Sequence, residues 1–364
     1  MDSNVSLHSL SFLDHQFSTN FIPQKFIWPK DENQFTNQDD DQEQLNEPII
    51  DLHGFINGEN ESARRVAELV RSACLSHGLF QVINHGVDLN LIKLVNNHVK
   101  DFFNLPIDEK LRVKRLPGSV WGYSFAHADR FSLKLPWKET ISCFYHEKDS
   151  DFDSGFFKLA FGDEFEEKGL IFRRYCEAMT NLSLTIVEIL GMSLGVDESY
   201  FKEFFHDSSS IMRCNLYPPC QEPGLVLGTG PHCDPTALTI LHQDQVGGLQ
   251  VFADNKWKSV RPRNDALVVN LGDTFAALSN GVYKSCPHRA VVNKTMERIS
   301  LVFFLCPRED KVIVPPQNLV TSNRVREYPD FTWSDLLQFT QNHYRVDVAT
   351  LQNFITWLIS HQTS

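Results

Sequence analysis

The chain has 364 residues, 42% of them hydrophobic, and a formal net charge of −12 at pH 7. This composition predicts a globular protein with a well-buried core, organised as one large domain or two smaller ones. The acidic balance argues against nucleic acid and against an anionic membrane surface as partners. No apolar run reaches the roughly 18–20 residues that cross a bilayer, and the N-terminus lacks the pattern of a secretory signal. Eight scattered cysteines without a CxxC pair are typical of reduced thiols, which predicts a cytoplasmic protein.

The N-terminal half begins with a polar segment and continues with helical patterns. Residues 1–45 are acidic, rich in Gln and Asn and poor in core-forming residues, so we expect a flexible extension. Residues 46–205 predict a helix-rich region that packs on the core. Within it, apolar residues with helical spacing predict helices over 62–77, 89–105 and 166–194, and a strand follows the first of them.

The pattern changes after about residue 205. Short β-type runs separated by Gly, Pro, Asn and Asp fill residues 206–310 and predict an antiparallel sandwich or barrel. Residues 311–364 leave this sheet and end in two predicted helices.

One of the β-type runs begins with a histidine and an aspartate two positions apart, His232 and Asp234. Side chains i and i+2 of a strand point to the same face, about 6.6 Å apart. His288, on another predicted strand, offers a third ligand. Two histidines and one carboxylate leave up to three positions of an octahedral ion open, a pattern linked to non-haem Fe(II) oxygenases. A chance pairing stays an alternative, because the chain has 14 His and 46 acidic residues.

Arg298 and Ser300 also lie at i and i+2, in the otherwise apolar run "ISLVFFLC". A buried guanidinium without an anion is costly, and no acid lies near it on that strand. A planar carboxylate held bidentately by the arginine, with the hydroxyl as a second donor, satisfies both groups. The alternative is a structural salt bridge to an acid from elsewhere in the fold.

Several stretches together resemble the plant 2-oxoglutarate/Fe(II)-dependent dioxygenases, from about Pro48 to the C-terminus: "NLYPPC", "PHCDP", "LTILHQDQVGGLQV", "NLGDTFAALSNGVYKSCPHRAVVN" and "RISLVFFLCP". The resemblance implies an α+β fold. Its core is a distorted double-stranded β-helix, or jelly-roll, flanked by helices from the N-terminal half and from the C-terminus. It also implies Fe(II) as the metal, 2-oxoglutarate and dioxygen as co-substrates, and ascorbate as the reductant.

The resemblance also implies roles for individual residues of this chain. His232, Asp234 and His288 resemble the iron ligands. Arg298 and Ser300 resemble the pair of residues that holds the distal carboxylate of 2-oxoglutarate in this family. Further contacts to that co-substrate are implied for Tyr217 and, on the same strand face, Asn215.

A narrower resemblance, to the gibberellin 20-oxidases within this family, rests on the motif "LPWKET" at residues 135–140. It implies that Trp137, Lys138, Glu139 and Thr140 recognise the substrate, a diterpenoid carboxylate. The implied reaction oxidises carbon-20 of a twenty-carbon gibberellin stepwise through alcohol and aldehyde, and loss of that carbon gives a nineteen-carbon lactone. Because an anionic substrate must reach an acidic protein, we expect a local cation in the cavity besides Arg298. A structural role for this Pro-bent segment is the alternative.

Three other functions share parts of this pattern. Another plant dioxygenase of the same family, either a different gibberellin oxidase or a flavonoid-type enzyme, would have the same core residues. A zinc hydrolase also uses two histidines and an acid, but it has no need of Arg298 and Ser300. A non-catalytic jelly-roll binder would tolerate loss of the triad, which is complete here. In each case we expect a monomer.

Overall fold

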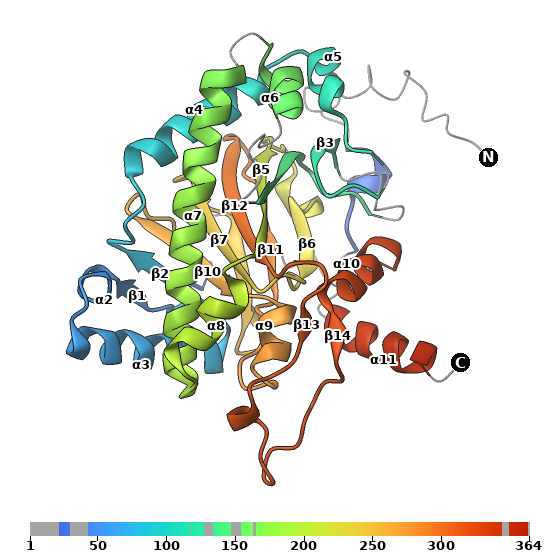
Figure 1. Cartoon of the computed structure of the whole chain (residues 1–364). Helices are drawn as coiled ribbons and strands as arrows, with labels where there is room; N and C mark the ends of the chain where they lie inside the picture. The colour runs from blue at the N-terminus through green and yellow to red at the C-terminus, as the bar shows by residue number, and fades with distance from the viewer. Residues whose placement is uncertain are drawn as a thin grey trace.

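The protein is described by a computed structural model, which covers residues 22–29, 43–116, 118–126, 134–146, 154–162, 165–343 and 349–362. Within these residues, one sheet has eight strands in the order β1-β2-β10-β7-β12-β5-β4-β3, and a second has four in the order β6-β11-β8-β9. All neighbouring strands are antiparallel except β1 and β2, which are parallel. With helices on the outside, this confirms the predicted α+β class (Figure 1).

The large sheet takes four of its eight strands from before residue 206, so the helix-rich N-terminal region also builds the sheet. Long apolar runs form its central strands, which are buried along most of their length. Its strands are β1 Ile49–Asp51, β2 Leu79–Ile83, β3 Gly122–Phe125, β4 Glu139–His146, β5 Ser209–Tyr217, β7 Leu238–Gln243, β10 Ala266–Leu271 and β12 Arg298–Cys306.

The small sheet has shorter and partly exposed strands: β6 Thr229–His232, β8 Leu249–Ala253, β9 Lys256–Ser259 and β11 His288–Ala290. A separate two-stranded sheet pairs β13 Val312–Ile313 with β14 Phe331–Thr332. The strands of the predicted β-type region are therefore divided between two sheets, as in the predicted sandwich.

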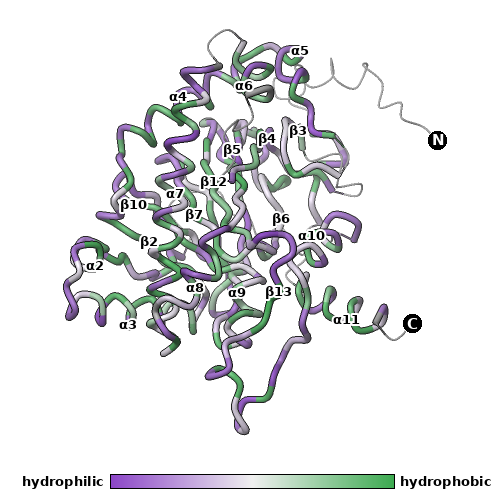
Figure 2. Tube along the Cα trace, in the orientation of Figure 1, coloured by the Kyte–Doolittle hydropathy of each residue, from purple (hydrophilic) through white to green (hydrophobic). Residues whose placement is uncertain are grey.

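Helices cover the outer face of the large sheet, where α7 runs along its length with α3 and α4 beside it (Figure 1). The predicted helix over 166–194 is confirmed as α7, and its buried side chains recur every three or four residues, as at Tyr175, Met179 and Leu182. Figure 2 shows the apolar strands of the sheet behind this helix. The helices of this half are α2 His53–Ile56, α3 Asn60–Ser76, α4 Leu89–Phe103, α5 Ile107–Lys110, α6 Ser154–Phe161, α7 Phe165–Leu194 and α8 Glu198–Phe205.

The C-terminal region contains the two predicted helices, α10 Trp333–Asn342 and α11 Thr350–Gln362. A capping box starts α10, because the Thr332 hydroxyl accepts from the Asp335 backbone N–H while the Asp335 carboxylate accepts from that of Thr332. A short helix, α9 Asp273–Leu278, lies between β10 and β11 in the chain. All of its residues are buried.

Part of the segment expected to be a flexible extension packs on the folded body. Phe26 is buried with its ring centre 5.1 Å from that of Trp137, and the Trp28 backbone N–H donates to the Leu225 carbonyl. Leu45 is also buried. Phe26 and Trp28 belong to the short apolar run "FIPQKFIW", whereas most acids of the expected extension lie at positions 31–43, so composition averaged over residues 1–45 predicted no order. Residues 1–21 and 30–42 of the expected extension lie outside the described residues.

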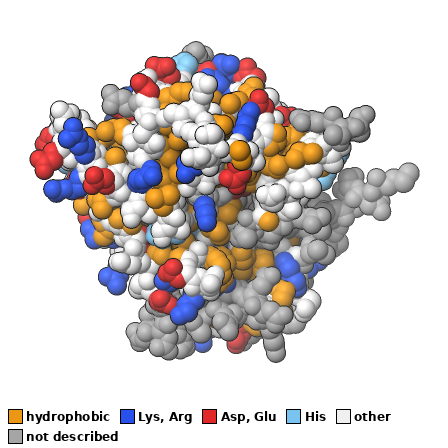
Figure 3. Space-filling model, turned by 90° about the horizontal axis from the view of Figure 1, so that it is seen from below, with side chains coloured by type: hydrophobic (Ala, Val, Ile, Leu, Met, Phe, Trp, Pro, Cys, Tyr) orange, Lys and Arg blue, Asp and Glu red, His pale blue; other side chains and the backbone are white. Residues whose placement is uncertain are grey.

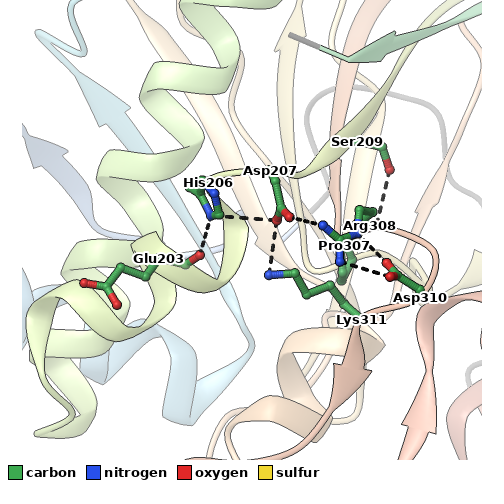
Figure 4. A network of polar contacts seen from close by, with 8 residues as sticks. All are labelled: Glu203, His206, Asp207, Ser209, Pro307, Arg308, Asp310 and Lys311. Carbon is green, nitrogen blue, oxygen red and sulfur yellow. Dashed lines mark hydrogen bonds and ion pairs between the residues drawn. The ribbon is translucent and has the colours of Figure 1, made fainter. Parts of the chain in front are cut away.

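A polar network fixes the junction between α8 and the large sheet (Figure 4). Asp207 pairs with Arg308 and, at 3.2 Å, with Lys311, while Arg308 also binds Asp310. The Ser209 hydroxyl donates to the Pro307 carbonyl at 3.2 Å. The network thus ties the start of β5 to the end of β12, two strands that also carry polar residues of the cavity described below.

The surface seen from below mixes hydrophobic side chains with lysine, arginine and acidic ones (Figure 3). None of the helices in the described part of the chain combines the length and apolarity that a bilayer crossing requires.

Candidate active site

A cavity of about 150 Å³ lies between the two sheets, since strands of both line it. One part of its wall is polar and includes the predicted metal and co-substrate residues. Another part is apolar and receives two residues from α10. The large apolar residues of the lining include Val120, Ile211, Leu241, Leu249, Val302, Phe304, Trp333 and Leu337.

The structure brings His232, Asp234 and His288 together from β6, the turn after it, and β11. One ligand atom of each lies within 4.8 Å of the others. The Nε2 atoms of His232 and His288 lie 3.5 and 3.7 Å from the two oxygens of Asp234. The two histidines face each other across β6 and β11, whose register pairs them directly. Three such donors around one point form a facial site for a divalent ion with open positions.

Hydrogen bonds aim these donors at the centre of the site. The Nδ1–H groups of His232 and His288 donate to the Gly230 and Cys286 carbonyls at 2.8 and 2.9 Å, which leaves each Nε2 lone pair for a metal. Oδ2 of Asp234 accepts from Thr239 Oγ1 at 2.6 Å. The donor set and its orientation fit an Fe(II) ion.

The pKa shifts of Asp234 and His288 agree with ligation of a metal. Asn270 Nδ2 donates to Asp234 Oδ2 at 3.0 Å, next to the Thr239 hydroxyl. Burial by itself would raise the pKa of the Asp234 carboxyl, but the two histidines and the hydroxyl outweigh it and hold that pKa below its ordinary value. Burial, with the neighbouring His232, lowers the pKa of His288 to about 4. A carboxylate and neutral imidazoles are the forms that bind metals.

Arg298 and Ser300 lie on β12 and line the cavity, as predicted. Asn215 and Tyr217 face them from β5, paired with Ser300 and Arg298 respectively. The Asn215 amide donates to Ser300 Oγ at 3.2 Å. The guanidinium carbon of Arg298 lies 4.9 Å from the centre of the Tyr217 ring.

The Arg298 guanidinium is 2% exposed and has no carboxylate partner among the described residues. Its Nη2 donates to Gln243 Oε1 at 3.2 Å, and its Nε is a buried donor without a hydrogen-bond partner in this part of the chain. The structure thus disfavours the alternative of a structural salt bridge. An unsatisfied buried guanidinium beside a hydroxyl fits a carboxylate ligand.

Of the four predicted substrate residues, only Lys138 lines the cavity. Trp137 packs on Phe26. The Glu139 carboxylate binds Lys110 and the Tyr123 hydroxyl, both at 2.7 Å, on the opposite side of β4. Thr140 is fully buried, and its hydroxyl donates to the Cys214 carbonyl. Three of the four residues therefore support the fold around Lys138 and do not reach the cavity.

Several residues of the site were not predicted. Thr239 and Asn270 bind the carboxylate of Asp234, and Gln243 binds Arg298. Arg213 lines the cavity two positions before Asn215, on the same face of β5. The strand alternation that selected Asn215 and Tyr217 also selects position 213, so this signal was present in the sequence.

Two segments of the chain match known families. Residues 208–307 match the 2OG-Fe(II) oxygenase superfamily, and residues 48–158 match a domain described as "non-haem dioxygenase in morphine synthesis N-terminal". Gibberellin 20 oxidase 2 of Oryza sativa is 52% identical over 338 residues, which span 93% of this chain and 85% of that relative. The chain belongs to the 2OG-Fe(II) oxygenase superfamily. It is an oxidoreductase, a dioxygenase that uses Fe(II) and 2-oxoglutarate, which sets aside the zinc hydrolase and the non-catalytic binder.

Other relatives of this dioxygenase agree. Gibberellin 20 oxidase 1-D of Triticum aestivum is 50% identical over 94% of both chains, and gibberellin 20 oxidase 1 of Arabidopsis thaliana is 52% identical over 93% of this chain and 89% of its own. Among solved structures, JOX2 in complex with 2OG, Fe and JA is similar with a TM-score of 0.80 at 30% identity, over 97% of this chain and 98% of JOX2. The predicted jelly-roll fold is thereby confirmed.

Proposed function

We propose that this dioxygenase oxidises carbon-20 of twenty-carbon gibberellins in successive steps, through alcohol and aldehyde to a nineteen-carbon lactone. The observation that carries the proposal is the 50–52% identity to gibberellin 20 oxidases of rice, wheat and Arabidopsis over 93–94% of the chain. The apolar wall beside a cationic, buried lysine also suits a carboxylate on a large hydrocarbon skeleton.

We propose His232, Asp234 and His288 as the ligands of Fe(II). Their hydrogen bonds to backbone carbonyls, to Thr239 and to Asn270 fix the donor atoms before the metal binds, which supports this role. When bound, Fe(II) and 2-oxoglutarate supply the oxidising chemistry, and dioxygen is the second co-substrate.

We propose that Arg298 and Ser300 bind the distal carboxylate of 2-oxoglutarate. The unsatisfied Nε of Arg298 and the Ser300 hydroxyl converge on the same part of the cavity. Tyr217 orients the guanidinium through its ring, and Asn215 orients the Ser300 hydroxyl. Holding the far end of the co-substrate fixes the direction in which its other end meets the metal.

The cellular location and the oligomeric state are two further parts of the proposal. We propose a cytoplasmic location, supported by eight cysteines that are all buried and free of disulfides. We propose that the enzyme acts as a monomer.

The test is incubation with a labelled twenty-carbon gibberellin, Fe(II), 2-oxoglutarate and ascorbate, followed by identification of the products. We expect products oxidised at carbon-20 and one succinate for each oxidation step, with no turnover when 2-oxoglutarate is omitted. Oxidation at another position, or turnover only of a flavonoid, would assign the enzyme to another branch of the family.

A further inference from the structure

The strand register places a buried glutamine beside the residues proposed for the distal carboxylate of 2-oxoglutarate. In the large sheet β12 lies between β5 and β7, and Ser300 on β12 pairs with Asn215 on one side and with Gln243 on the other. Directly paired side chains of neighbouring strands lie on the same face of a sheet. Thr239 and Leu241, at alternate positions before Gln243, line the cavity. The Gln243 side chain therefore lies on the cavity side of the sheet.

The amide of Gln243 has a defined orientation. Its Oε1 accepts from Arg298 Nη2 at 3.2 Å. Because a guanidinium carries donors only, the amide oxygen must face Arg298 and the Nε2 group must point away from it. Gln243 is 3% exposed, and its Nε2 has no hydrogen-bond partner in the part of the chain that the structure describes. Buried donors without an acceptor are rare in folded proteins, so the amide is held in this orientation by its bond to Arg298.

Gln243 is also the one hydrogen-bond partner of the Arg298 guanidinium among the described residues. The nearby acid Asp244 forms no ion pair with Arg298 there, and its carboxylate accepts from two backbone N–H groups instead. The centre of the Tyr217 ring lies 4.9 Å from the guanidinium carbon. The ring thus holds the face of the guanidinium and the amide holds one edge, which leaves the charge to a ligand.

The position of this guanidinium limits the length of the co-substrate. A 2-oxo diacid must reach the metal with one end and Arg298 with the other. Hydrogen bonds to backbone carbonyls fix His232 and His288 at the metal end, and Gln243 fixes Arg298 at the far end. The span between the two ends is therefore set by the protein, and a diacid with one methylene group more or fewer fits it poorly.

We propose that Gln243 is a positioning residue that sets the depth of Arg298 in the cavity and thereby selects 2-oxoglutarate over longer and shorter 2-oxo diacids. The inference rests on the proposed role of Arg298 as the ligand of the distal carboxylate. It adds a cause of selectivity for chain length, which a guanidinium free to move along the cavity would not provide.

The test measures the binding of three 2-oxo diacids to the enzyme loaded with Fe(II) under anaerobic conditions, by titration calorimetry. The diacids are oxaloacetate, 2-oxoglutarate and 2-oxoadipate, each one methylene group longer than the one before. Gln243→Met keeps the size of the side chain and removes its amide, whereas Gln243→Glu keeps an acceptor for Arg298 and adds a negative charge. Arg298→Leu is the reference for complete loss of the guanidinium.

Gln81→Met is the matched control. Gln81 is a buried glutamine of the same sheet, on β2, and its amide donates to the Arg261 carbonyl at 3.1 Å, away from the described lining of the cavity. Circular dichroism and thermal unfolding confirm that each variant folds.

We expect the wild type and Gln81→Met to bind 2-oxoglutarate at least about 10-fold more tightly than 2-oxoadipate, the low end for one methylene group in a fitted site. Gln243→Met should weaken 2-oxoglutarate about 10-fold, the low end for a hydrogen bond to a charged group. It should also reduce the preference over 2-oxoadipate, because a released guanidinium can move to meet a longer chain. Gln243→Glu should weaken all three diacids, since its carboxylate neutralises Arg298. The affinity for Fe(II) without a diacid should stay unchanged in every variant.

An unchanged preference for 2-oxoglutarate over 2-oxoadipate in Gln243→Met would overturn the proposal, even if both affinities fell together. If Gln243→Met does not fold, Gln243→Glu decides, and unchanged affinities for the diacids in that variant would overturn the proposal. Unchanged binding of 2-oxoglutarate by Arg298→Leu would contradict the proposed role of Arg298 and the inference with it. The measurement uses no gibberellin, so a failure of the proposed oxidation at carbon-20 would leave its outcome intact.

Discussion

The metal end and the cationic end of the cavity differ in how their polar groups are satisfied. At the metal end, protein groups already bind the outward-facing atoms of His232, His288 and Asp234. At the cationic end, Lys138 has only neutral acceptors and Arg298 keeps an unpartnered Nε among the described residues. The first end is organised before any ligand binds, whereas the second is completed by anionic ligands. Substitutions at the metal end should therefore impair metal binding and turnover. Substitutions at the cationic end should impair the binding of anionic ligands.

The largest effect should come from Asp234→Ala, which removes one of three ligands together with the acceptor of two hydrogen bonds. We expect Fe(II) binding and product formation to fall to background while the fold persists. Metal titration and product analysis measure this. Asp254→Ala is the control, because Asp254 is an exposed acid paired with Lys258. Full turnover by Asp234→Ala would show that Asp234 is not a ligand of the catalytic metal.

Arg298→Leu should come next. Loss of a charged hydrogen bond to a carboxylate costs about 1.5–3 kcal/mol, so the KM for 2-oxoglutarate should rise about 10- to 100-fold. Fe(II) affinity in the absence of co-substrate should stay the same, which separates the two ends. Initial rates at varied 2-oxoglutarate give the KM. An unchanged KM for 2-oxoglutarate with weakened metal binding would assign Arg298 to the metal end instead of the co-substrate.

Acidification should destabilise the metal-free protein through two buried histidines. Burial lowers the pKa of His242, outside the cavity, and of His288 to about 4. Because the unfolded value is about 6.5, unfolding takes up protons as the pH falls from 6.5 to 4, and stability falls with it. The loss should be about 2 kcal/mol per histidine at pH 5 relative to pH 7.

Denaturant unfolding at pH 7, 6 and 5 measures this loss. His242→Gln should remove the part of the stability loss that comes from His242 and leave the part that comes from His288. Asp234 should contribute only below about pH 4, because its pKa lies below the ordinary value. A free energy of unfolding that is constant from pH 7 to pH 5 would contradict the buried neutral imidazoles.

The smallest effect should come from Thr239→Val, which keeps the shape of the side chain and removes its bond to Asp234. Metal affinity should fall about 10-fold, the low end for outer hydrogen bonds, because Asn270 still donates to the same oxygen. Thr236→Val is the matched control, since its buried hydroxyl has no hydrogen-bond partner in the described chain. Similar losses in both variants would show that Thr239 acts through packing.

Strand alternation explains how much of the site could be predicted. It holds for Arg298 and Ser300, which both lie on β12 and line the cavity. His232 and Asp234 also line the cavity, but Asp234 lies in the turn after β6, where strand alternation does not apply. The same rule separates Lys138, which lines the cavity, from its neighbour Glu139, which does not. Glu139 binds Lys110, 29 residues earlier and on another element, and no local pattern reports such a contact.

Two parts of the fold could not be predicted, for different reasons. Helix α9 is buried on every side, so it lacks the one-sided apolar pattern that marks surface helices. The contact of Phe26 with Trp137 joins residues more than 100 positions apart, and composition averaged over the N-terminal segment hides the short apolar run that holds Phe26. Both depend on tertiary packing.

The packing of residues 22–29 has a practical consequence for producing this enzyme. The family match begins at residue 48, which invites a shortened version that starts there. Such a version would lose Phe26 and Trp28, and the indole of Trp137, next to Lys138, would be exposed to water. We expect this shortened version to aggregate. Crystals or kinetic data obtained from it would misrepresent the cavity. An affinity tag should therefore be added ahead of the whole N-terminal segment rather than replace it.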